Sequence, residues 1–177
     1  MIYTETKING VYIIEPELLN DERGFFARSF CKEEFAKYGF ETDIVQCNIS
    51  YNKKKGTLRG MHYQVPLFEE AKIVSCIEGS IYDVVVDLRR DSSTYCQWVA
   101  IDLSDKNFKM MFIPKGCAHG FQTLEDNTMV YYQMMEFFHP ECAKGVRWDD
   151  PAFKIEWPNV RKRVISDKDL SYNNYRL

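Results

Sequence analysis

Short apolar or alternating runs recur along this chain, and turn-forming residues separate them. Alternation of apolar and polar positions over four to eight residues is typical of a strand with one buried face. The expected strands cover residues 11–16, 25–31, 43–50, 57–64, 71–79, 80–88, 97–103, 108–114, 118–124 and 129–138. Many short strands at this spacing predict an all-β sandwich or barrel.

Helix is scarce in this pattern. Residues 32–39 predict one short amphipathic helix that ends at Gly39, and the segment after Pro151 is irregular and polar. Glu78 and Gly79 separate two strand-like runs in the manner of a hairpin turn. The chain shows no internal repeat and no linker, so we expect a single domain over residues 1–177.

Composition and charge narrow the function classes. Aromatic residues make up 15% of the 177 residues, which favours sheet over a helix bundle. The net charge of −3, with both signs interspersed, argues against nucleic-acid binding but leaves room for a small phosphate site. Neither a signal peptide nor an apolar run long enough to span a membrane is visible. Six scattered cysteines without a C-x-x-C pair predict reduced thiols and a cytoplasmic location.

His62, in the run GTLRGMHYQ at residues 56–64, is the first candidate for chemistry. Strict alternation places Gly60 and His62 on one face of the strand and Arg59 on the other. By pattern alone, His62 is better explained as a structural residue and Arg59 as a surface charge. A metal site would need His62 together with His119 and His139, and the chain lacks the H-x-H pair typical of metal-binding barrels, so we predict no metal.

Acid–base chemistry at His62 would need a carboxylate to orient the ring, and the sequence leaves Asp83, Asp87 and Asp169 all open. Lys72 begins an apolar strand, where it either stabilises an anion or is an ordinary edge lysine. Tyr131 and Tyr132 are neighbours, so only one of the two can point into a barrel.

Ten motifs, in order, resemble the dTDP-4-dehydrorhamnose 3,5-epimerases from about residue 11 to residue 169. They are DERGFF (21–26), QCNIS (46–50), GTLRGMHYQ (56–64), AKIV (71–74), EGSIYDVVVDLR (78–89), the ST-Y-x-x-W run that ends at Trp98, IPKGCAHGF (113–121), GVRWDDP (145–151), IEWP (155–158) and SDKD (166–169). The resemblance implies a cupin-like double-stranded β-helix, or jelly-roll barrel, with a few short helices. It further implies a homodimer without metal or cofactor, in which the partner's N-terminal strand helps complete each site.

The resemblance also implies a reaction, the inversion of C3 and C5 in a nucleotide-diphospho-4-keto-6-deoxyhexose through an enolate. In this family pattern His62 matches the general base, Asp169 the acid that orients it, Lys72 the group that stabilises the enolate oxygen, and Tyr132 the proton donor on the other face. The positions that match substrate contacts are Arg23 and Arg59 for the diphosphate, Gln46, Asn48 and His119 for sugar and phosphate, and Phe26 for the nucleotide base.

Five positions depart from the common family pattern. Arg28 stands where glutamate is usual near the nucleotide, and Phe138 replaces the second tyrosine of a pair near the sugar; both are kept as predicted substrate contacts. Glu70 stands where glutamine is common, Ser75 replaces a frequent arginine, and Cys117 replaces a frequent phenylalanine. We interpret the changes at Ser75 and Cys117 as neutral drift within a divergent subgroup. A single-centre epimerase or ketoisomerase acting on a CDP-, GDP- or UDP-linked sugar, and a non-catalytic sugar-nucleotide binding protein, remain alternatives.

Overall fold

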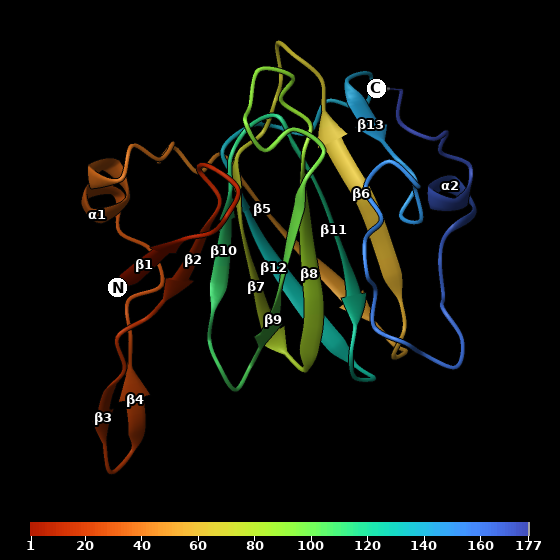
Figure 1. Cartoon of the computed structure of the whole chain (residues 1–177). Helices are drawn as coiled ribbons and strands as arrows, with labels where there is room; N and C mark the ends of the chain where they lie inside the picture. The colour runs from red at the N-terminus through yellow and green to blue at the C-terminus, as the bar shows by residue number, and fades with distance from the viewer. Residues whose placement is uncertain (177) are drawn as a thin grey trace.

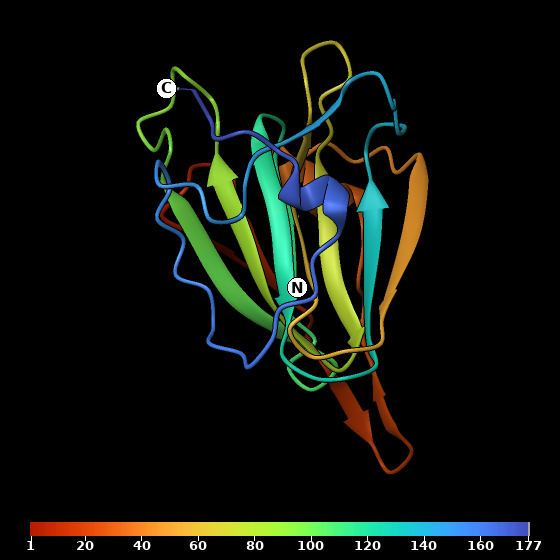
Figure 2. The same cartoon turned by 90° about the vertical axis from the view of Figure 1, so that its right-hand side faces the viewer.

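The computed structural model describes residues 1–176, which form two facing antiparallel sheets and a separate hairpin (Figures 1 and 2). The strands are β1 (Ile2–Glu5), β2 (Tyr12–Glu15), β3 (Leu19–Asp21), β4 (Gly24–Phe26), β5 (Gln46–Asn52), β6 (Leu58–Gln64), β7 (Lys72–Glu78), β8 (Ser80–Asp87), β9 (Trp98–Ser104), β10 (Met110–Ile113), β11 (Cys117–Thr123), β12 (Thr128–Met134) and β13 (Ala143–Gly145); the helices are α1 (Lys32–Lys37) and α2 (Asp167–Leu170).

One sheet has six strands in the order β1-β2-β10-β7-β12-β5, and the other has five in the order β13-β6-β11-β8-β9. Every pairing between these strands is antiparallel. The predicted all-β, cupin-like architecture with few short helices is confirmed.

The turn at Glu78 and Gly79 does not close a hairpin, which corrects the sequence prediction. β7 belongs to the six-stranded sheet and β8 to the five-stranded sheet, so the chain crosses between layers at Gly79. A Cβ atom at Gly79 would lie 2.6 Å from the Thr128 hydroxyl oxygen, so glycine is needed at this tight crossing. The spacing of the apolar runs shows that two strands are close in the sequence, but it does not show whether they pair.

The core lies between the two sheets, and each sheet also has a covered outer face. The interior cluster contains Ile8, Val11, Val74, Cys76, Ile81, Val85, Leu103, Met111, Ile113, Cys117, Phe121 and Val130. A second cluster, around Phe35 of α1, covers one end of the six-stranded sheet. A third cluster, around Met61 and Phe153, packs the irregular C-terminal segment against the five-stranded sheet.

The N-terminal region differs from the sequence prediction. The run 25–31 was expected to be one strand, but only Gly24–Phe26 is extended, and it pairs with β3 in a two-stranded hairpin. This hairpin projects away from the two sheets (Figure 1). The predicted short helix is confirmed as α1, with acidic residues in its first turn and Lys37 in its last.

Neither helix in residues 1–176 is long and apolar enough to cross a membrane. All six cysteines are free thiols in the structure.

Asp87, at the end of β8, organises the loop that leads to β9. Its fully buried carboxylate accepts hydrogen bonds from Arg89 Nε at 2.8 Å, Ser92 Oγ at 2.6 Å and Thr94 Oγ1 at 2.7 Å. Arg89 also donates from Nη2 to the Asn9 carbonyl, which ties this loop to the N-terminal turn. Burial acts to raise the pKa of Asp87, but these donors outweigh it and lower the pKa to about 2.

We expect the Asp87→Asn variant to lose about 2 kcal/mol of unfolding free energy at pH 7, because a carboxyl whose pKa is lower in the folded than in the unfolded state stabilises the fold once it is ionised. This contribution is present above the pKa of the unfolded chain and is lost as the pH falls from about 4 toward 2. Urea unfolding across this pH range should therefore show the gap between wild type and variant narrowing toward acid. Asp91→Asn, an exposed carboxylate in the same loop, is the control. A gap that does not change with pH would contradict the assignment.

Candidate active site

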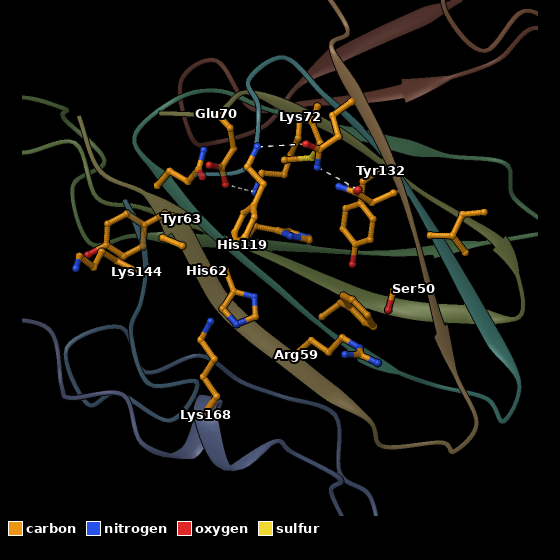
Figure 3. A pocket seen from close by; sticks show the side chains of 18 of the residues that line it. Ser50, Arg59, His62, Tyr63, Glu70, Lys72, His119, Tyr132, Lys144 and Lys168 are labelled. Carbon is orange, nitrogen blue, oxygen red and sulfur yellow. Dashed lines mark hydrogen bonds and ion pairs between the residues drawn. The ribbon is translucent and has the colours of Figure 1, made fainter. Parts of the chain in front are cut away.

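A cavity of about 450 Å³ opens between the two sheets, and residues from both sheets and from α2 line it (Figure 3). His62 of β6 and His119 of β11 line it from the five-stranded sheet. Lys72 of β7 and Tyr132 of β12 line it from the six-stranded sheet. Nine of the predicted site residues lie at this cavity or touch a residue that lines it: Gln46, Asn48, Arg59, His62, Lys72, His119, Tyr132 and Phe138 line the wall, and Asp169 contacts His62.

A β-bulge brings Arg59 and His62 to the same side of β6. His62 lies opposite His119 on β11, and Arg59 lies opposite Phe121. Two residues of β6, Gly60 and Met61, therefore lie opposite the single residue Gly120 of β11. The extra residue shifts the alternation by one step, and both side chains line the cavity. Strict alternation predicted opposite faces and is wrong here, because the bulge near Gly60 brings Arg59 to the side of His62.

Two glycines permit this bulge. A Cβ atom at Gly60, whose φ is +128°, would lie 2.6 Å from Gly120 Cα and 2.9 Å from the His119 carbonyl oxygen. A Cβ atom at Gly120 would lie 2.7 Å from the Arg59 carbonyl oxygen. The two backbones therefore approach more closely than any side chain would allow.

Asp169 holds both the bulge and the histidine. Its Oδ1 lies 2.7 Å from His62 Nε2, and its Oδ2 accepts a hydrogen bond from the Gly60 N–H at 3.3 Å. Burial acts to raise the pKa of Asp169, but the hydrogen bond and charge of His62, with help from Gly60 and Ser166, lower the pKa below its ordinary value. Asp169 is therefore an ionised carboxylate that accepts a hydrogen bond from the Nε2–H of His62. This tautomer leaves the lone pair on Nδ1 of His62 free.

The three carboxylates that the sequence left open each have a different partner. Asp169 pairs with His62, while Asp83 Oδ1 lies 2.6 Å from His119 Nε2 in a second, more deeply buried pair. Asp87 pairs with Arg89, in the loop network described above.

The wall formed by the six-stranded sheet carries a lysine, Lys72, and a tyrosine, Tyr132. The Lys72 side chain is 6% exposed, so the alternative of a solvent-directed edge lysine is excluded. Tyr132 lines the cavity and Tyr131 lines a groove on the other side of the same sheet, so only one of the two tyrosines points inward, as predicted. Burial, and then the Asp83 carboxylate, raise the pKa of Tyr132, and they outweigh the lowering effects of Arg59 and Ser50. The Tyr132 hydroxyl therefore keeps its proton at neutral pH.

Polar contacts fix the rim of the cavity on the β5 side. Gln46 donates from Nε2 to Asn48 Oδ1 at 3.1 Å and accepts the Phe138 N–H at 3.2 Å. Arg59 donates from Nε to Asn52 Oδ1 at 2.8 Å, which orients its guanidinium group. The Phe138 residue is 58% exposed, which leaves its ring available at the cavity mouth.

Three predicted contacts do not line the cavity. Arg23 and Phe26 lie on the projecting β3–β4 hairpin, where Arg23 pairs with Asp21 and the Phe26 residue is 72% exposed. Arg28 follows the hairpin and pairs with Glu34 at 2.6 Å. Within one chain, these residues are separate from His62 and Tyr132.

Sequence reasoning overlooked several residues that line the cavity. Lys168 belongs to the same SDKD motif as Asp169 and reaches the cavity from α2, and Lys144 lines it from β13. Ser50 follows Gln46 and Asn48 at the same alternation on β5, a signal that could have predicted it. With Arg59 and Lys72, the two additional lysines make four cations against one carboxylate, Glu70, in the cavity wall. This charge balance favours an anionic ligand.

His139 is separate from the other two histidines. Its ring stacks on Phe68 at 3.7 Å, and the residue does not line the cavity. Among the side chains of residues 1–176, no group of three or more His, Cys, Asp or Glu has the arrangement of a metal site.

Comparison with known proteins agrees over almost the whole chain. Residues 5–176 match the family model described as dTDP-4-dehydrorhamnose 3,5-epimerase. A dTDP-4-dehydrorhamnose 3,5-epimerase of Methanothermobacter thermautotrophicus is 43% identical over 176 residues, which are 98% of this chain and 94% of the relative.

Solved structures give the same result. The dTDP-4-dehydrorhamnose 3,5-epimerase of Bacillus anthracis, with TDP and PPi bound, is 38% identical with a TM-score of 0.94 and covers 98% of this chain and 99% of its own. The dTDP-6-deoxy-D-glucose-3,5-epimerase of Legionella pneumophila, in complex with dTDP-4-keto-L-rhamnose, is 37% identical with a TM-score of 0.92. The match covers 98% of this chain and 92% of the Legionella chain. Together with the family model, these likenesses establish that the chain belongs to the dTDP-4-dehydrorhamnose 3,5-epimerase family.

Proposed function

We propose that this protein is an isomerase that inverts C3 and C5 of a dTDP-linked 4-keto-6-deoxyhexose by removing and returning protons beside the C4 ketone. The observation that carries the proposal is the arrangement of the cavity. The His62–Asp169 pair lies on one sheet wall, and Lys72 and Tyr132 lie on the other. Inversion requires a base and an acid on opposite faces of one carbon, and the two sheets supply these positions.

His62 takes the proton in this scheme. Nε2 is held by the Asp169 carboxylate, so Nδ1 is the basic nitrogen, and Asp169 stabilises the imidazolium that forms. The C–H bond beside the ketone breaks, and its electron pair moves onto the C4 oxygen to give an enolate.

Lys72 and Tyr132 complete the cycle. The Lys72 ammonium stabilises the negative charge on the enolate oxygen in a cavity that is partly shielded from water. Tyr132, which keeps its proton because burial raises its pKa, then donates that proton to the opposite face of the carbon. The electron pair returns from oxygen to carbon, and the centre is inverted. His62 then releases its proton to water and Tyr132 takes up a proton, which restores both groups for the next turnover.

The remaining lining residues suit the rest of the substrate. Arg59 and Lys168 offer positive charge to a diphosphate, and arginine in particular can bind its oxygens through two parallel donors. Gln46, Asn48 and His119 also line the cavity, which supports their proposed role as contacts to the sugar and phosphate groups. Phe138 at the mouth offers an aromatic face to the sugar end of the substrate.

The protein acts as a cytoplasmic homodimer in this proposal, and the β3–β4 hairpin of one subunit completes the site of the other. The exposed Phe26, together with Arg23 and Arg28, lies outside its own cavity but on a segment that projects toward solvent. Placed against a partner's cavity, this hairpin adds arginines for the diphosphate and an aromatic ring for the base.

Replacing the base should stop proton exchange. In D₂O, NMR of dTDP-4-keto-6-deoxyglucose should show deuterium entering C3 and C5 with wild-type protein, and the rate should fall by about 10²- to 10⁴-fold in His62→Ala. His139→Ala, which removes a histidine outside the cavity, should exchange at the wild-type rate. Full exchange in His62→Ala would contradict the role of His62.

Replacing the acid should separate exchange from inversion. Tyr132→Phe removes the hydroxyl but leaves His62 and Lys72 in place, so deuterium should still enter the substrate while formation of the inverted sugar slows by about 10²-fold or more. Tyr131→Phe, on the other side of the sheet, is the matched control. If Tyr132→Phe inverts the sugar at the wild-type rate, another group donates the proton.

Mixing two impaired variants, assayed at a low substrate concentration, tests the shared site. Arg23→Glu should weaken substrate binding by about 10- to 100-fold through the lost charged hydrogen bond. If the hairpin acts across the dimer, subunits of Arg23→Glu and His62→Ala that are unfolded and refolded together should recover activity, because some mixed dimers contain one intact site. A monomer in light scattering, or no recovery in mixtures shown to contain mixed dimers, would refute the arrangement.

A further inference from the structure

Glu70 and Lys72 form a buried ion pair in the wall of the cavity. Glu70 Oε1 lies 2.7 Å from Lys72 Nζ, and the two side chains are 7% and 6% exposed. The second oxygen of Glu70, Oε2, is buried without a hydrogen-bond partner in residues 1–176. A buried carboxylate with an unpaired oxygen is costly, and a buried ion pair is weak evidence for a stabilising role. The pair therefore calls for a functional explanation.

The backbone places the two side chains next to each other. Lys72 is the first residue of β7 and Glu70 precedes it by two residues, and both side chains line the cavity (Figure 3). Ala71 points the opposite way, into the hydrophobic cluster around Phe35, and its carbonyl accepts the Met135 N–H at 2.9 Å. The main chain that carries Glu70 and Lys72 is thus anchored to β12.

Lys72 needs such a neighbour if its ammonium group is to be held in one position in the cavity. A lysine side chain has a flexible four-carbon stem and three equivalent N–H donors, so it does not fix its own orientation. The hydrogen bond to Glu70 occupies one donor and restricts the position of Nζ. Because the nitrogen is tetrahedral, fixing one N–H also limits the directions in which the other two N–H groups can point.

We propose, on the basis of the proposed function, that Glu70 is a positioning residue that holds the Lys72 ammonium where the enolate oxygen develops. Glu70 acts through its oxygen at 2.7 Å from Nζ and does not touch the reacting carbons. The position of this oxygen, rather than the negative charge, is what Lys72 requires.

Two conservative variants separate position from charge. Glu70→Gln keeps an acceptor oxygen at the same distance along the side chain and removes the charge. Glu70→Asp keeps the charge and withdraws the oxygens by roughly the length of one C–C bond, about 1.5 Å. We expect Glu70→Gln to retain kcat within about threefold and Glu70→Asp to lose about 10- to 100-fold in kcat with little change in KM, since a misplacement of this size costs up to about 10²-fold.

A double-mutant cycle tests whether Glu70 acts through Lys72. In a Lys72→Ala background, Glu70→Asp should cause no further loss of deuterium exchange beyond about twofold. Glu69→Gln, an adjacent carboxylate that does not line this cavity, is the control. Circular dichroism checks that each variant folds, and Glu70→Ala, which removes the oxygen altogether, takes the place of Glu70→Asp if the latter does not.

The outcomes are distinct. Full activity in Glu70→Asp, loss of activity in Glu70→Gln, or an equal loss from Glu70→Asp with and without Lys72 would each overturn the inference about Glu70. No deuterium exchange by the wild-type protein on dTDP-4-keto-6-deoxyglucose would instead overturn the proposed function itself.

Discussion

The close contact between Gly60 and Gly120 is the constraint on which the rest of the site depends. Because neither residue has a Cβ atom, β6 can insert one extra residue against β11 and bring Arg59 to the same side as His62. The same bulge presents the Gly60 N–H to Asp169, which in turn binds His62. A side chain at either glycine would disturb the strand pairing and the positions of Arg59 and His62 together.

The two-layer architecture explains why the chemistry can be two-sided. His62 and His119 lie on neighbouring strands of one sheet, and each has its own carboxylate. Lys72 and Tyr132 lie on neighbouring strands of the other sheet. Apolar side chains fill the space between the sheets elsewhere in the barrel, whereas at this end polar side chains from both sheets line a cavity. The fold thus supplies opposed walls, and a few polar residues convert one end of the core into a cavity.

Local pattern predicted most strands because alternation depends only on neighbours in the chain, as β12 illustrates with Tyr131 outside and Tyr132 inside. Pattern could not predict that β7 and β8 belong to different sheets, since pairing depends on the whole topology. Nor could it choose among Asp83, Asp87 and Asp169, because His62 and Asp169 are 107 residues apart. The family motifs made that choice, and the geometry agrees with it. The bulge at Gly60 is a place where simple alternation failed, and it lies in the wall of the cavity, as expected if such failures gather at functional sites.

Charge in the cavity is distributed unequally, and this has a consequence for binding. Arg59, Lys144 and Lys168 carry no buried carboxylate partner in the described chain, whereas Lys72 is compensated by Glu70. An anionic diphosphate therefore gains most from the first three cations, which lie nearer to solvent. The buried pair is neutral overall until negative charge develops on the sugar. In the proposed mechanism, binding energy and stabilisation of the enolate can thus come from different cations, so strong attraction for the diphosphate need not weaken the selectivity of Lys72 for the transition state.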